Sequence, residues 1–203
     1  MGLKNTTLTY GTVARYIHWA TAFIVLFLLA LGLYMEDLDF SPQKLALYGL
    51  HKSFGFTVLG LVIVRILWRA ANPAPHHLAT HQRWEVLLAR FMHVCLYLAL
   101  IGMPLSGWVM SSAADFPHTF FNLFSMPDLI PGKNDALYKL SRLAHGWCAY
   151  ALIAAIGLHM AGALKHHVID RDSTLRRMLP DNTAKSFAAL LFIMVGLTGL
   201  YYL

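Results

Sequence analysis

Charged residues are scarce in this chain of 203 residues. Asp, Glu, Lys and Arg together make up 13% of it, hydrophobic residues make up 58%, and the mean hydropathy is +0.55. An ordinary soluble domain carries about 25% charged residues, so this composition excludes that class. Because a helix satisfies its own backbone hydrogen bonds in lipid, we predict an all-α integral membrane protein.

Carboxylates are rarer than cations, with 10 Asp and Glu against 16 Lys and Arg. The formal net charge of +6 does not indicate a nucleic-acid partner, because the basic residues lie in short connections between apolar runs. In that position they set the topology of a membrane protein. We therefore expect membrane lipid, and no nucleic acid, around this chain.

Cysteine is nearly absent as well. Cys95 and Cys148 both fall in apolar runs, near opposite faces of the expected membrane, so we expect no disulfide and regard both as small packing residues. Neither belongs to a C-x-x-C-H motif, which excludes covalent haem attachment. The sequence also lacks a convincing cleavable signal, because its first apolar run is too long for one.

Five apolar segments are present instead. The first four are long enough to span a bilayer, and the fifth is only just long enough; they cover residues 16–35, 51–68, 90–110, 142–164 and 186–203. We expect a four-helix transmembrane bundle in residues 1–180 and an additional C-terminal transmembrane helix in residues 181–203.

Lys and Arg orient these segments. The N-terminal tail and the second and fourth connections hold 11 of the 16, which by the positive-inside rule places the N-terminus in the cytoplasm. The longest connection, residues 111–141, is then external. Its aromatic residues and prolines predict a segment that lies at the membrane interface.

Eleven histidines are many for so apolar a chain. His145 and His159 share one predicted helix, residues 140–167, about 21 Å apart along its axis and about 40° apart around it. An ionisable side chain at such depth marks a functional site. A lone intramembrane histidine is more often a hydrogen-bonded packing residue, but further histidines occur at matching depths.

The matching histidines lie on other predicted helices. His51 opens the second helix on the external side, with His145, and His18 lies in the first turn of the first helix on the internal side, with His159. Haem b needs two axial imidazoles from facing helices. We therefore predict two haem b groups, with iron held by His51 and His145 and by His18 and His159, and no open iron position for oxygen.

Other internal residues have open alternatives. His93 can replace His18, bind a haem propionate or line a quinone pocket, and His166 can donate to a quinone carbonyl or simply lie at the interface. Arg15 is a candidate partner of a propionate, as are Arg65 and Arg69, although all three also fit topology-setting charges. The histidines of the connections are expected to be solvated: His76, His77, His81 and His118.

Four stretches resemble the bacterial cytochrome b561 family. They are RYIHW from Arg15, HKSFG from His51, RFMHVCLY from Arg90, and HGW followed by GLHMAGALKHHVIDRDSTLRRMLP, between His145 and Pro180. The resemblance covers about residues 10–180, and the last motif is the most specific. It implies a four-helix membrane cytochrome with two b-type haems, whose ligands fall on His18, His51, His145 and His159. The fifth segment departs from this compact form.

The resemblance also implies a function. Family members exchange electrons with the quinone pool, and some are superoxide oxidases of the bacterial inner membrane that pass electrons from superoxide to ubiquinone. Such a superoxide:ubiquinone oxidoreductase would oxidise superoxide at the periplasmic side. Because superoxide is an anion, cations near the external haem would steer it; the candidates are Lys52, Lys139 and Arg142, with Lys133 nearby.

Two alternatives remain. The first is a cytochrome b subunit that passes electrons between the quinone pool and a partner redox protein, including a periplasmic one, and the additional helix favours it. The second is a transporter whose histidines bind zinc or relay protons. The scarcity of intramembrane carboxylates and the wide separation of His145 from His159 argue against the transporter.

Overall fold

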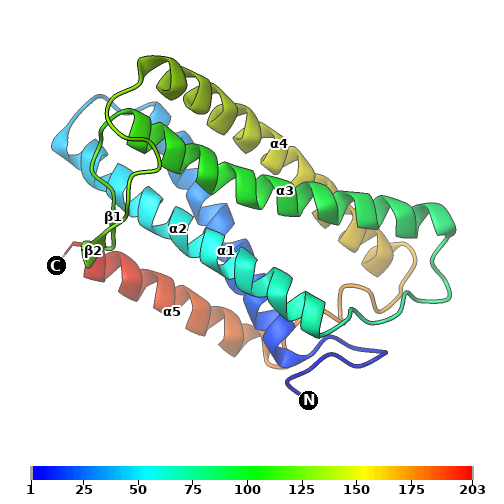
Figure 1. Ribbon diagram of the computed structural model, residues 1–203. Helices are drawn as coiled ribbons and strands as arrows, with labels where there is room; N and C mark the ends of the chain where they lie inside the picture. The colour runs from blue at the N-terminus through cyan, green and yellow to red at the C-terminus, as the bar shows by residue number, and fades with distance from the viewer. Residues whose placement is uncertain (1, 203) are drawn as a thin grey trace.

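A computed structural model describes residues 2–202, apart from the side chain of Leu200, and its fold is a bundle of long helices (Figure 1). The helices are α1 (Thr12–Glu36), α2 (Pro42–Ala71), α3 (Arg83–Ala113), α4 (Asp135–Val168) and the shorter α5 (Thr183–Tyr201). The connection between α3 and α4 contains an antiparallel hairpin of β1 (Thr119–Phe120) and β2 (Phe124–Ser125).

Polar residues just before the apolar runs start three of the long helices. The Ser41 hydroxyl accepts a hydrogen bond from the backbone three residues on, and Pro42 occupies the first turn of α2. Gln82 and Glu85 form a capping box at α3. The Asn134 side chain caps α4 in the same way as Ser41 caps α2.

Because of these caps, the helices begin earlier than the sequence predicted. α2 begins at Pro42 rather than at residue 51, and α4 begins at Asp135 rather than at residue 140. His51 therefore lies well inside α2 instead of opening it, and His18 lies in the second turn of α1 instead of the first. The prediction followed the apolar runs, whereas the capped helices extend through polar turns as well.

The core of the bundle is a stripe along α2. Its members recur every four residues, so they lie on one face of the helix; they are Leu50, Phe54, Val58 and Val62, all buried. The Phe54 ring lies 5.2 Å from the ring of Phe27 on α1, centroid to centroid. α2 thus packs against α1 and α3, whereas α4 packs mainly against α3.

The outer surface of the bundle is apolar. Large hydrophobic side chains are exposed on the long helices, among them Phe91, Leu98, Trp147 and Leu158. An apolar surface of this extent is unfavourable in water but suits lipid. Within the described residues, the four long helices α1 to α4 are each long and apolar enough to cross a membrane.

α5 is helical, as the sequence predicted, although its apolar part is shorter than those of the other helices. Near its start, Ser186 and Tyr16 of α1 join their hydroxyl groups at 2.8 Å. At its other end, the Asn122 side chain of the hairpin donates to the Tyr201 carbonyl at 2.9 Å. We call the end of the bundle near the N-terminus the N-terminal end, and the end that carries β1 and β2 the hairpin end. α5 runs from the N-terminal end to the hairpin end (Figure 1).

The connection between α3 and α4, which we predict to lie at the membrane interface, packs against α2. Its hairpin folds onto the bundle: Phe121 is buried with its ring centroid 5.2 Å from that of Phe54, and its backbone donates to the Ser53 hydroxyl at 3.0 Å. His118, expected to be solvated, is buried beside Asp128 at 3.3 Å. Phe121 thus finds an apolar partner in α2, whereas Phe116 and Phe124 are exposed.

Candidate functional site

At the hairpin end, α2 and α4 bring His51 and His145 together. Their ring centroids lie 6.3 Å apart and their planes are inclined by 71°. A metal–imidazole bond is about 2.0 Å long, so two imidazoles on opposite sides of one metal have centroids about 6 Å apart. The two rings have the spacing of axial ligands without touching each other.

α3 holds the His145 ring in place. The Nδ1 atom of His145 lies 3.0 Å from the Met103 carbonyl oxygen and 3.1 Å from the Ser106 hydroxyl, so Nε2 is the nitrogen left for a metal. A methyl group on Gly107 would lie 3.1 Å from the His145 ring, so this glycine makes room for the imidazole. The sequence did not predict these roles of Met103, Ser106 and Gly107. The main indication in the sequence is Pro104, a proline inside an apolar helix, which lies next to Met103.

A hollow adjoins this pair. It is lined by residues of all four long helices, including both histidines of the pair. Gly55 lines the hollow one turn after His51, and a methyl group added there would meet no atom within 4 Å. The walls are mostly apolar, for example Val25, Leu28, Leu100 and Leu152. Two imidazoles within apolar walls fit a haem.

The N-terminal end repeats this geometry with His18 of α1 and His159 of α4. Their ring centroids are also 6.3 Å apart, and their planes are inclined by 70°. His93 of α3 lies closer to His159, with a centroid separation of 5.3 Å. Of the two neighbours, His18 reproduces the spacing of the other pair, which favours it over His93 as the second axial ligand.

Two arginines near this pair differ in their surroundings. Arg65 lies near enough to the three histidines to act on each electrostatically, with its guanidinium 5.6 Å from the Tyr97 ring centroid. Arg15 is buried and donates to the Leu179 carbonyl at 2.8 Å and to Asp181 at 3.0 Å. These bonds tie α1 to the connection before α5, so Arg65 is the better placed partner for a propionate.

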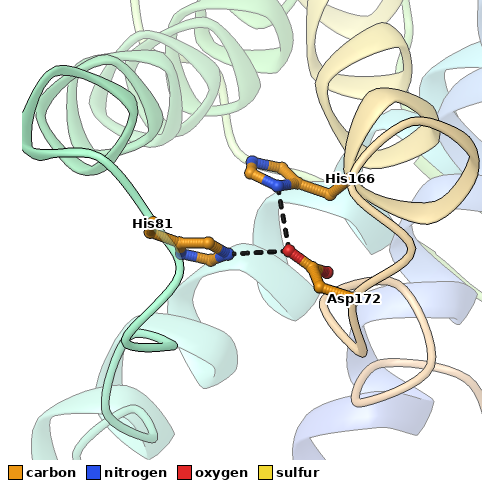
Figure 2. A group of neighbouring side chains, drawn as sticks. All are labelled: His81, His166 and Asp172. Carbon is orange, nitrogen blue, oxygen red and sulfur yellow. Dashed lines mark hydrogen bonds and ion pairs between the residues drawn. The ribbon is translucent and has the colours of Figure 1, made fainter.

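His166 belongs to a polar cluster at the N-terminal end. Its Nδ1 atom lies 2.8 Å from Asp170 and 3.1 Å from Asp172. His81, expected to be solvated, lies against the same Asp172 at 3.2 Å and against the Thr174 hydroxyl at 3.0 Å (Figure 2). The connection before α3 folds back toward the end of α4, so the His81 side chain is only 11% exposed. The role of His166 toward a quinone stays a prediction.

Asp172 is charged in this setting. Its burial raises the pKa, but hydrogen bonds from Thr174 and His81 and the charge of His166 outweigh burial and hold the pKa below its usual range. The carboxylate is therefore ionised at neutral pH. This end of the bundle presents fixed negative charge close to two imidazoles.

The cations expected to steer superoxide are placed unequally. Lys52 lines the hollow beside His51, and its amine donates to the Pro117 carbonyl at 2.6 Å. Lys139 and Arg142 are exposed near the start of α4 and do not line the hollow. Lys133 is paired with Asp135 at 3.3 Å. Only Lys52 of these four is at the candidate site itself.

Comparison with known proteins decides the family. Residues 9–181 match the family model described as prokaryotic cytochrome b561. The chain belongs to the prokaryotic cytochrome b561 family. As a cytochrome b561 it is a multi-pass membrane protein that transfers electrons by means of b-type haem, and both histidine pairs lie within the matched residues.

Relatives match this cytochrome b561 over most of their length. Cytochrome b561 homolog 2 of Escherichia coli (strain K12) is 34% identical over 186 residues, which cover 88% of this chain and 95% of the relative. Cytochrome b561 homolog 1 of the same organism is 29% identical over 170 residues, 81% and 93% of the two chains. The probable superoxide oxidase CybB of Yersinia pestis is 28% identical over 179 residues, 84% and 96%.

Proposed function

We propose that this cytochrome carries electrons through two haem b groups, from superoxide on the periplasmic side to ubiquinone on the cytoplasmic side. The observation that carries the proposal is the repeated geometry of two histidine pairs. Each pair has ring centroids 6.3 Å apart, and each takes one histidine from α4. One rigid helix thus relates the two sites.

In this proposal His51 and His145 hold the haem iron at the hairpin end, and His18 and His159 hold the other. When bound, the haems supply one-electron redox chemistry. The chain keeps the imidazoles in place: the Met103 carbonyl fixes the His145 ring, and Arg65 offers positive charge to a propionate of the second haem.

The proposed reaction balances as follows. Two superoxide anions each lose one electron at the hairpin end and leave as dioxygen. One ubiquinone takes up these two electrons, with two protons from the cytoplasmic side, and leaves as ubiquinol. His51 and His145 would together hold the haem iron and leave it no free position for dioxygen, and Lys52 would attract superoxide to the edge of the site.

The proposed setting is the bacterial inner membrane, with the N-terminus in the cytoplasm and the hairpin end in the periplasm. The bias of Lys and Arg supports this orientation, since 11 of 16 lie on the N-terminal side. Residues 1–180 form the haem-binding unit, and residues 181–203 add α5. His93, His166 and Arg15 stay candidates for the quinone or propionate contacts of the cytoplasmic side.

The superoxide part is supported by similarity to the relative named probable superoxide oxidase CybB and by the position of Lys52. Stopped-flow mixing of the oxidised protein with superoxide tests it, with haem absorbance as the signal. We expect rapid haem reduction and, with ubiquinone present, one ubiquinol for every two superoxide anions consumed. Superoxide dismutase in the protein syringe is the control and should abolish both signals.

Two outcomes would reject parts of this proposal. If the haem stays oxidised after mixing with superoxide, superoxide is not the electron donor. If the haem is reduced but does not pass electrons to ubiquinone, ubiquinone is not the electron acceptor.

A second function is a cytochrome b subunit that passes electrons between the quinone pool and a partner redox protein. The observation in its favour is α5, which lies beyond residues 9–181 of the family match and presents Leu191, Phe192 and Val195 outward. Purification in mild detergent tests it. A stoichiometric redox partner, together with no reaction of the isolated cytochrome with superoxide, would decide for this function.

A further inference from the structure

Three side chains from separate parts of the chain converge at the N-terminal end, outside both histidine pairs. His81 comes from the connection between α2 and α3, His166 from the last turn of α4, and Asp172 from the connection between α4 and α5 (Figure 2). Their side chains are 11, 15 and 7% exposed, respectively. Two partly buried imidazoles that both point at one carboxylate are not expected of solvated surface histidines.

The distances match those of a metal site. The Asp172 Oδ2 atom lies 3.2 Å from Nε2 of His81 and 3.1 Å from Nδ1 of His166, and the three ligand atoms all lie within 4.8 Å of one another. Ligands bound to zinc at about 2.0 Å in a tetrahedron are about 3.3 Å apart. A cation can therefore be placed among these atoms with small adjustments of the side chains.

Hydrogen bonds alone serve this arrangement less well. A neutral imidazole carries one N–H. His81 Nε2 faces both Asp172 and the Thr174 hydroxyl, and His166 Nδ1 faces both Asp172 and Asp170. At His166 the single Nδ1 proton would have to serve two carboxylates, whereas a cation there would satisfy both of them together.

The local charge also favours a divalent cation. Three carboxylates, Glu85, Asp170 and Asp172, lie around the cluster, and the single ammonium group of Lys165 pairs with the first two. With both histidines neutral, as they would be when bound to a metal, these four charges sum to −2. A divalent ion would neutralise them, and imidazole with carboxylate is a donor set that suits zinc and other first-row transition metals.

We propose that His81, His166 and Asp172 bind a divalent transition metal of the zinc class, with Asp170 as a further ligand. The metal fastens the two connections at this end of the bundle to the end of α4. The site shares no residue with the proposed haem ligands, although His166 is also a candidate quinone contact. His81 and Asp172 belong to the metal site alone, so their variants test it separately from the electron-transfer proposal.

Zinc retention tests the site. The protein, purified without a polyhistidine tag, is stripped with EDTA, equilibrated with zinc at pH 7.5 and desalted, and zinc and haem are then measured separately. We expect one zinc per chain in the wild type and at least about tenfold weaker zinc binding after His81→Ala or Asp172→Asn. Zinc should also be released at pH 5.5, where protons compete for imidazole.

His76→Ala is the matched control, because this exposed histidine lies in the same connection as His81. It should retain zinc, and all three variants should retain wild-type haem content, which shows that they fold. The proposal is overturned if the wild type retains no zinc, or if His81→Ala and Asp172→Asn retain as much zinc as the wild type.

Discussion

Replacing His159 with alanine is expected to remove the haem at the N-terminal end and to leave the other in place. The His159 ring lies at ligand spacing from His18, whereas His51 and His145 form a pair of their own near the hairpin. A haem with one axial histidine missing is held weakly, so haem content should fall by about half. Superoxide should still reduce the remaining haem, but ubiquinone reduction should be lost.

The same measurements on two further variants give this prediction its controls. His167→Ala, at the same helix end, should keep full haem content. His93→Ala should also keep it, because the His93 ring is 5.3 Å from that of His159, closer than the spacing of the other pair. Loss of one haem from His93→Ala but not from His18→Ala would instead make His93 the ligand. Full haem content in His159→Ala would show that His159 does not hold a haem.

Neutralising Lys52 and Arg142 together is expected to lower the rate constant for superoxide by roughly threefold to tenfold, because steering by charge contributes about 10-fold or more to association rates. Lys52→Gln keeps a donor for the Pro117 carbonyl, so the double variant Lys52→Gln/Arg142→Gln changes charge with little change in structure. The rate should also become less dependent on salt, since salt screens the attraction that has been removed.

Lys185→Gln is the control for this experiment. It removes one positive charge from the start of α5, at the opposite end of the bundle, and should leave the superoxide rate unchanged. A double variant whose rate and salt dependence both equal those of the wild type would show that these cations do not steer superoxide.

The long helices and the histidine depths could be predicted from the sequence. Apolar length and composition are local properties, and a 14-residue interval on a straight helix fixes the relation between His145 and His159. The same logic paired them with His51 and His18 even though the predicted helix starts were wrong. A shift of a helix start changes the length of the helix and leaves the order of its residues along the axis unchanged.

Contacts between distant segments could not be predicted in this way. His81 and His118 fall in connections, where solvation is the usual expectation, and only the folded chain shows that one meets Asp172 and the other Asp128. The contribution of α3 was missed for a similar reason. Its Met103 carbonyl is a backbone group, and backbone groups leave no mark on the sequence.

The structure also gives a physical reason for the specific tail that follows α4. Arg177 donates to the carbonyl oxygens of Leu8 and His76, and the Met178 carbonyl accepts from the Trp19 side chain at 2.9 Å. These bonds fasten the tail to three other parts of the chain. The tail thus closes the N-terminal end of the bundle, beside the pair formed by His18 and His159.

The ratio of haem b to protein in the wild type tests the central claim most directly. A pyridine haemochrome assay on protein produced with ample haem is expected to give two haems per chain, as two bis-histidine sites require. His145→Ala and His159→Ala should each lose a different one, with distinct changes in the reduced spectrum. A single haem in the wild type, or the same spectral loss in both variants, would contradict the account.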